Sequence, residues 1–195
     1  MPPPPRYPPS PEARAGSPAL PTRVAYDDLD YHLVSSDPAP LYMGELPRSY
    51  EEQPARAVMN LCGAYPPGQA FGHVVHTMAL LDVLDEAFAP ARKQLEQFLD
   101  AAHLYAAHEP TYWHCHAGLN RSGLAVAAYL HRHRGLRISD AIERLRTRRT
   151  PMVLCNSRFE GMLRTWYGDD DEQDFEEVDM EAFLSHRTGG RGDWR

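Results

Sequence analysis

A ten-residue stretch, His114 to Gly123, carries the residue types that could bind and attack a phosphate group. Cys115 supplies a thiol, Arg121 supplies a planar cation that can make two parallel hydrogen bonds to phosphate oxygens, and Gly118 lets the backbone curve between them. The stretch lies where an apolar run gives way to a helical pattern. The free amides at the start of a helix, together with the helix dipole, favour an anion. We therefore expect a cradle for a tetrahedral dianion with a nucleophilic sulfur at its base.

The loop and its flanks also supply groups that support a sulfur nucleophile. The positive field at the start of the helix favours the ionised form of the Cys115 thiol. Ser122 is placed to donate a hydrogen bond to that sulfur and to help it depart in a later step. The residues expected to bind the phosphate are His116, Ala117, Gly118, Leu119, Asn120 and Arg121.

Taken together, residues 114–123 resemble the Cys-x5-Arg-Ser signature of the protein tyrosine phosphatase superfamily, in its dual-specificity branch. The stretch reads His-Cys-His-Ala-Gly-Leu-Asn-Arg-Ser-Gly, which is a more specific match than a lone cysteine and arginine. The resemblance extends to residues 41–44, 58–61 and 148–159. It covers roughly residues 40 to 168 and leaves both ends of the chain unexplained.

The resemblance implies a two-step hydrolysis of phosphomonoesters that needs no metal or other cofactor. Cys115 attacks phosphorus in line and forms a cysteinyl-phosphate, while a carboxylic acid protonates the departing oxygen and then, as a carboxylate, activates water. Arg121 and the loop amides stabilise the phosphate oxygens throughout. By the same resemblance, His114 fixes the loop by hydrogen bonding. The expected substrate is a protein phosphorylated on tyrosine, serine or threonine.

Two aspartates compete for the role of general acid. In the family this acid lies on a loop upstream of the cysteine, and Asp82 and Asp85 stand 33 and 30 residues before Cys115. Asp82 directly follows the strand-like apolar run Met78–Leu81, which matches the family better. We favour Asp82. The alternative role of Asp85 is to place negative charge near the start of the next helix.

Other interpretations of these residues stay open. Cys115 can be an inert buried cysteine, and the chain can be a catalytically inactive phosphate-binding module, which needs neither a nucleophile nor an acid. A zinc site is disfavoured because adjacent strand residues point to opposite faces and no second Cys/His pair stands at zinc spacing, so we expect no metal. The substrate can also be a phosphoinositide, an RNA 5′-phosphate or a phosphorylated carbohydrate. Lipid-acting relatives often carry lysines where this loop has His116 and Leu119, which disfavours the inositide.

Cys62 is a candidate redox partner of the nucleophile. It lies at the end of a predicted strand, where some lipid and dual-specificity phosphatases have a resolving cysteine. Parallel strands present their carboxyl ends together, so the Cys62 sulfur can approach Cys115 and trap its oxidised form as a disulfide. The alternative is that Cys62 is a small core residue.

Composition limits the class of protein. The chain has 195 residues, a net charge of −7 and 43% hydrophobic residues, which suits one domain with tails. No segment approaches the ~20 apolar residues of a membrane span, and three cysteines cannot form a paired disulfide framework, so we expect a cytoplasmic protein. The acidic charge argues against nucleic acid as the main partner. We expect a monomer.

The two ends of the chain differ from its middle. Nine of the 18 prolines lie in the first 21 residues, and nine acidic residues with no base lie between Asp169 and Glu181. Such stretches cannot bury enough surface to offset their ordering entropy. We predict a disordered Pro-rich tail at 1–23, a catalytic domain at 24–168 and an acidic, disordered tail at 169–195. The segment from Arg132 to Arg149, with seven arginines and two acids, is predicted to be a basic surface that the acidic tail partly masks.

Short apolar runs alternate with helical patterns inside this domain, which predicts an α/β fold with helices flanking a mostly parallel or mixed sheet of about four or five strands. The predicted strands are Leu41–Met43, Val58–Cys62, Val74–Met78 and Tyr112–Cys115. Helices are predicted from Pro90 to about Tyr105, from Ser122 to Gly135, from a Ser139 cap to about Arg149, and from a Ser157–Glu160 capping box to about Gly168.

Overall fold

The computed structural model describes residues 31–66, 72–83 and 90–168. The predicted tails at 1–23 and 169–195 lie outside the described residues, and so does Asp85. Within the described part of the chain, no helix is both long enough and apolar enough to cross a membrane.

A five-stranded mixed sheet has the strand order β1-β2-β5-β3-β4. Its strands are β1 (Tyr31–Ser35), β2 (Leu41–Gly44), β3 (Ala57–Asn60), β4 (Val74–Thr77) and β5 (Thr111–His114). The β1–β2 pair is antiparallel, and every other pair is parallel. On either side of β5, Gly44 and Asn60 both pair with His114, so the ends of β2, β3 and β5 meet where the Cys115 loop begins.

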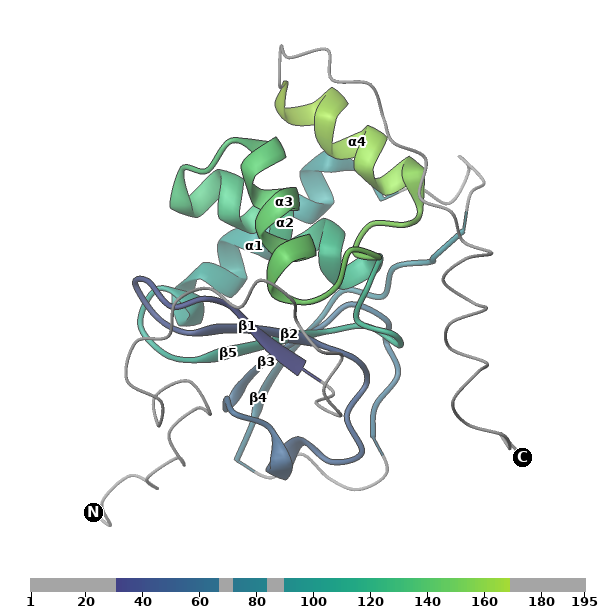
Figure 1. Cartoon of the computed structure of the whole chain (residues 1–195). Helices are drawn as coiled ribbons and strands as arrows, with labels where there is room; N and C mark the ends of the chain where they lie inside the picture. The colour runs from purple at the N-terminus through teal and green to yellow at the C-terminus, as the bar shows by residue number, and fades with distance from the viewer. Residues whose placement is uncertain (1–30, 67–71, 84–89, 169–195) are drawn as a thin grey trace.

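The predicted α/β fold with a mixed sheet is confirmed. Four helices lie together on one side of the sheet in Figure 1. They are α1 (Arg92–Ala106), α2 (Arg121–Arg134), α3 (Ile138–Arg148) and α4 (Ser157–Tyr167), and the short helix η2 (Tyr50–Glu52) follows β2. The four predicted strands correspond to β2 to β5. The strand β1, which pairs with β2 at the edge of the sheet, was not predicted.

Alternating strand residues divide the core between the two faces of the sheet. Met43, Met59 and Trp113 are buried with the apolar faces of the helices. Their neighbours on the same strands, among them Val58 and Tyr112, form a smaller cluster on the other face. Because α2 is buried over nine consecutive residues, from Ser122 to Leu130, the start of this helix is fixed firmly beneath the candidate loop.

The predicted starts of the first and third helices are wrong. The first helix starts at Arg92, not Pro90, with Ala91 in the cap position. The third starts at Ile138 after Arg137, so Ser139 lies inside it and makes no cap. In both helices the start lies within two residues of the predicted position, and no side chain caps it.

The predicted Ser157–Glu160 capping box is also absent. Asn156 occupies the cap position of α4, and its side chain accepts a hydrogen bond from the Arg158 amide at 3.2 Å. Glu160 instead forms ion pairs with Arg146 and Arg164. The predicted glycine ends of two helices are confirmed, since Gly135 and Gly168 follow α2 and α4 in the left-handed conformation.

Candidate active site

The loop between β5 and α2 has its backbone carbonyls bound from outside the loop. His116 O accepts a hydrogen bond from the Leu46 amide at 3.1 Å, and Leu119 O accepts one from the Leu154 amide at 3.3 Å. Each trans peptide places its N–H opposite its C=O. Carbonyls held from outside therefore turn the neighbouring amides toward the inside of the loop, above Cys115.

Arg149 holds the two carbonyls between these. Its Nε donates to Gly118 O at 2.7 Å and its Nη2 donates to Ala117 O at 3.3 Å. Its Nη1 donates to Met43 O at 3.3 Å and contacts Nδ1 of His32 at 3.1 Å. A buried guanidinium thus fixes the back of the loop against β1 and β2, and it adds positive charge behind the predicted phosphate cradle.

Gly118 is required by the close approach of the loop to β2. Its φ is +63°, and an added Cβ would lie 2.3 Å from the Gly44 carbonyl carbon and 2.6 Å from Nη2 of Arg149. Both atoms belong to groups that are held in place. Only glycine therefore lets the loop curve this tightly.

Cys115 lies at the base of this loop and is 1% exposed. Its Sγ is 3.4 Å from Oγ of Ser122, a fully buried residue in the first turn of α2. The structure therefore brings together the predicted nucleophile and the hydroxyl predicted to assist it. The N-terminus of α2 points its free amides and positive dipole end at the same place.

Arg121 begins α2 and turns its guanidinium toward the strand-like segment that ends in Asp82. Nη1 donates to Leu80 O at 3.4 Å. Nε is buried and has no hydrogen-bond partner among the described residues, while Oδ2 of Asp82 lies 3.8 Å away. A buried donor of this kind is costly unless it meets an acceptor, and an anion on the loop is suited to supply one.

Asp82 is held beside the loop by two side-chain amides. Asn120 Nδ2 donates to Oδ2 at 3.2 Å, and Asn156 Nδ2 donates to Oδ1 at 3.0 Å. The segment before it is tied to the sheet, since Met78 N donates to Asn60 O at 2.9 Å. Of the two candidate acids, Asp82 therefore lies at the site, whereas Asp85 is outside the described residues.

His114 is buried below the loop, where its Nε2 is 3.0 Å from the hydroxyl of Tyr50. Burial lowers the pKa of His114 to about 4, so the imidazole is neutral at physiological pH. Burial also raises the pKa of Tyr50, which keeps the hydroxyl protonated. These two neutral groups form a fixed contact on the β5 side of the loop, in keeping with the predicted supporting role of His114.

The remaining predicted site residues lie at the rim. His116 and Ala117 are exposed, and Leu119 is partly buried against the core. Cys62 is half-buried just after β3, and its Sγ donates to Oδ1 of Asn60 at 3.4 Å. Burial is the main cause that raises the pKa of the Cys62 thiol. No disulfide joins the described cysteines, so the redox role of Cys62 stays a prediction.

Three residues of the site were not predicted from the sequence. Arg149 was counted with the surface arginines, Tyr50 was not considered, and Arg149 and Asn156 were otherwise quoted only as part of a family resemblance. That resemblance was a usable signal for both Arg149 and Asn156, because it already matched their segment to the family. For Tyr50 no local pattern distinguishes a buried contact from a surface one.

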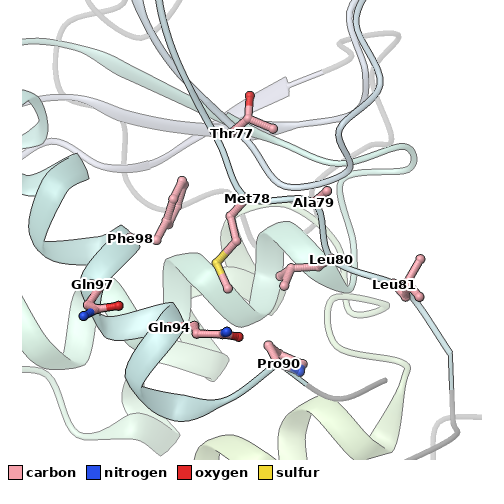
Figure 2. A pocket seen from close by; sticks show the side chains of 9 residues that line it. All are labelled: Thr77, Met78, Ala79, Leu80, Leu81, Pro90, Gln94, Gln97 and Phe98. Carbon is pink, nitrogen blue, oxygen red and sulfur yellow. The ribbon is translucent and has the colours of Figure 1, made fainter. Parts of the chain in front are cut away.

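A separate cavity of about 440 Å³ lies between the segment before Asp82 and α1 (Figure 2). Thr77–Leu81 line one side, and Gln94, Gln97 and Phe98 of α1 line the other. Neither Cys115 nor Arg121 lines it. Within the described ranges, no group of three or more His, Cys, Asp or Glu side chains is arranged to hold a metal ion.

One protein family matches this chain. The family described as "Dual specificity phosphatase, catalytic domain" matches residues 57–169, which include β3 to β5 and all four helices. No curated protein matches the sequence.

Several solved structures share the fold. Human DUSP28 is 23% identical with a TM-score of 0.60, over 71% of this chain and 93% of that chain. PTPMT1 is 21% identical with a TM-score of 0.55, over 83% and 99% of the two chains. Cydia pomonella PTP-2 is 19% identical with a TM-score of 0.57, over 70% and 89%. At these identities the likeness shows the fold alone.

Proposed function

Because this chain belongs to the dual specificity phosphatase family, a branch of the protein tyrosine phosphatase superfamily, we propose that it hydrolyses phosphomonoesters on proteins through a cysteinyl-phosphate at Cys115. One arrangement supports this activity above all. The Cys115 sulfur lies at the base of a loop whose carbonyls are bound from outside. The buried Nε–H of Arg121 has no hydrogen-bond partner among the described residues, and Oδ2 of Asp82 lies 3.8 Å from it. This arrangement supports Cys115 as the nucleophile, the loop with Arg121 as the anion cradle and Asp82 as the acid.

In the first step the loop amides and Arg121 bind the three terminal phosphate oxygens. The Cys115 thiolate attacks phosphorus opposite the ester oxygen, so that a P–S bond forms as the P–O bond breaks. Asp82, as a carboxylic acid, gives its proton to the departing oxygen, which leaves as an alcohol or phenol. The Ser122 hydroxyl, 3.4 Å from the sulfur, hydrogen-bonds the thiolate before attack.

In the second step a water molecule attacks phosphorus from the side that the alcohol has left. Asp82, now a carboxylate, takes the proton of this water, and the P–S bond breaks to release phosphate. Ser122 donates its hydrogen bond to the sulfur as negative charge returns to it, which makes the thiolate a better leaving group. The enzyme is thereby restored without a cofactor.

A protein substrate is favoured over an inositide because the loop lacks lysines at its two rim positions, where it has His116 and Leu119. Both phosphorylated tyrosine and phosphorylated serine or threonine fit a loop that recognises only the phosphate group. PTPMT1 has been solved in complex with PI(5)P, so a phosphoinositide belongs in the comparison.

Hydrolysis of p-nitrophenyl phosphate by the full chain tests the activity. We expect Cys115→Ser to lower kcat on the order of 10³-fold or more, because an alcohol replaces the nucleophilic thiolate. Arg121→Lys should lower kcat/KM by about 10²-fold, because lysine lacks the two-pronged donor. Equal rates in wild type and Cys115→Ser would refute catalysis by Cys115, and no hydrolysis by either would leave only a phosphate-binding module.

The substrate class requires a panel in which only the group carrying the phosphate changes. Phosphotyrosine, phosphoserine and phosphothreonine peptides should be compared with a phosphoinositide, an RNA 5′-phosphate and a phosphorylated carbohydrate at equal concentration. The proposal predicts the highest kcat/KM for the peptides. A higher kcat/KM for any other compound of the panel would refute a protein substrate and indicate that compound's class instead.

A further inference from the structure

We propose that Asn120 is a positioning residue that locks the general acid Asp82 onto the phosphate-binding loop, an inference that rests on the function proposed above. Asn120 stands in the cap position of α2, but its side chain makes no cap hydrogen bond to the helix. The side-chain oxygen of an asparagine at a helix start ordinarily accepts a hydrogen bond from a backbone amide of the first turn. Here the whole carboxamide is directed to other segments.

The Asn120 carboxamide joins three parts of the site. Its Oδ1 accepts from the Asn156 backbone amide at 2.9 Å and from the Cys155 thiol at 3.3 Å, both in the turn before α4. Its Nδ2 donates to Oδ2 of Asp82 at 3.2 Å. One side chain of the loop thus links the turn before α4 to the segment that carries the acid.

The orientation of this carboxamide is fixed by chemistry. A backbone N–H can only donate, so the atom that faces the Asn156 amide must be the oxygen of Asn120. The nitrogen therefore faces Asp82 as a donor. An oxygen acceptor in place of this nitrogen would be repelled by the Asp82 carboxylate oxygen. The contact therefore depends on an amide side chain at position 120.

The second oxygen of Asp82 is held in the same way by Asn156, whose Nδ2 donates to Oδ1 at 3.0 Å. Asn156 also caps α4 through its own Oδ1, so its replacement would weaken a helix as well as free the acid. Asn120 has no such second duty in its helix. Substitution of Asn120 therefore tests acid positioning more cleanly.

The expected consequence is confined to the step that needs a proton. A general acid acts only within hydrogen-bond reach of the departing oxygen. Without the Asn120 contact, Asp82 keeps one amide donor and is less often in that position. Departure of a poor leaving group should slow, whereas a strongly activated aryl group that leaves without a proton should depart almost as before.

The test compares kcat/KM for phenyl phosphate and for a strongly activated aryl phosphate in wild type and Asn120→Ala. The ratio is kcat/KM for phenyl phosphate divided by kcat/KM for the activated aryl phosphate. We expect this ratio to fall by about 10-fold in the variant, which is a part of the 10²–10⁴-fold that general acid catalysis supplies. Binding of the phosphate group is common to both substrates and cancels in the ratio. A loss equal for both substrates would overturn the inference, because it would indicate damage to the loop alone.

Two further variants keep the test independent of folding. Asn120→Asp retains an oxygen for the Asn156 amide and replaces only the donor that faces Asp82, so the ratio should fall here as well. Cys155→Ala removes the thiol contact but leaves the Asn156 amide to orient Asn120, so this matched control should keep the ratio within about twofold of wild type. A ratio unchanged in Asn120→Asp, or reduced equally in Cys155→Ala, would contradict the proposal.

Asp82→Asn distinguishes failure of this inference from failure of the proposed function. It should reduce the ratio more than Asn120→Ala does, and adding Asn120→Ala to it should change the ratio little further, since both act through one group. If Asp82→Asn leaves the ratio unchanged, Asp82 is not the acid and the positioning role fails with it, whereas hydrolysis through Cys115 is refuted only by the comparison of wild type with Cys115→Ser. If Asp82→Asn reduces the ratio and Asn120→Ala acts additively with it, only the positioning role is refuted.

Discussion

Acidification should destabilise this protein through His114, which is fully buried. Burial lowers the pKa of this imidazole to about 4, from an ordinary value of 6.5. Between these values the unfolded chain takes up a proton that the folded chain does not. The free energy of unfolding therefore falls as the pH falls from about 6.5, and the loss levels off below about pH 4.

The size of the effect follows from the difference of the two pKa values. At about 1.4 kcal/mol for each pKa unit, the whole shift amounts to about 3 kcal/mol, of which about 2 kcal/mol is lost between pH 7 and pH 5. This is a large share of the 5–15 kcal/mol that holds a typical domain folded, a general range for small proteins.

The assay is urea unfolding of wild type and His114→Gln at several pH values. Glutamine can place a polar atom near the Tyr50 hydroxyl, but it does not titrate. All other titrating groups are common to the two proteins, so the wild type should lose about 2 kcal/mol relative to the variant from pH 7 to pH 5. Tyr50→Phe should keep the wild-type pH dependence, because burial rather than this hydroxyl is the main cause of the lowered pKa. If the free energies of unfolding of wild type and His114→Gln differ by the same amount at every pH from 7 to 4, the pKa of His114 is not lowered in the folded protein.

Three other changes test the loop and its surroundings. Gly118→Ala forces a Cβ to within 2.3 Å of the β2 backbone, so it should lower the free energy of unfolding by about 3 kcal/mol and remove most of the activity. The control Gly161→Ala, whose Cβ would have nothing within 4 Å, should raise the free energy of unfolding by up to about 1 kcal/mol. Thermal or urea unfolding measures both, and a Gly118→Ala variant as stable as wild type would contradict the packing of the loop against β2. Arg149→Lys should raise KM several-fold and lower the free energy of unfolding by about 2 kcal/mol, because the ammonium cannot reach both loop carbonyls. The matched control Arg148→Lys, at an exposed neighbouring position, should change neither quantity. Equal effects of the two substitutions would contradict the role of Arg149 in holding the loop. Peroxide should convert Cys115 to a sulfenic acid, which condenses with the Cys62 thiol to a disulfide and releases water. Disulfide formation should be faster at higher pH, because the raised pKa of Cys62 leaves its thiol protonated at lower pH. If mass spectrometry finds oxidised Cys115 without this disulfide, the pairing is excluded.

Local sequence patterns were sufficient for most of the sheet and for the nucleophile loop. The strands β2, β3 and β5 are short, largely apolar runs, and all of their residues are buried. The edge strand β4 was predicted from its apolar residues, although they are exposed or only partly buried. The Cys115 loop was predicted because its glycine, arginine and serine stand at fixed spacings. β1 lacks such a signal: its first three residues are only partly buried, and it is held by pairing with β2 and by a hydrogen bond from Arg134 to Ser35 at 3.1 Å.

What the sequence did not reveal depends on contacts between distant segments. The arginines between Arg132 and Arg149 were predicted to form an exposed basic surface. Arg132 instead pairs with Asp100, Arg146 pairs with Glu160, and Arg149 is buried against the loop. A basic residue on a helix looks the same in the sequence whether its partner is solvent, a carboxylate or a carbonyl 31 residues away, as for Arg149 and Gly118.

Helix capping and the acid's surroundings are linked in the same way. Ser157 is the more conspicuous cap in the sequence, but Asn156 takes the position and also donates to Asp82. The cap and the acid contact use opposite ends of one carboxamide. A local rule considers only the first of these two contacts, so it could not rank Asn156 above Ser157.

Direct detection of the covalent intermediate tests most closely whether Cys115 is the nucleophile. Asp82→Asn slows the attack of water, so a strongly activated aryl phosphate should load this variant faster than the intermediate is hydrolysed. After denaturing quench and mass spectrometry, we expect one phosphoryl group per chain on the sulfur of Cys115, and none in Cys115→Ser. Turnover without a covalent phosphate, or a phosphoryl group on His116 in place of Cys115, would contradict it.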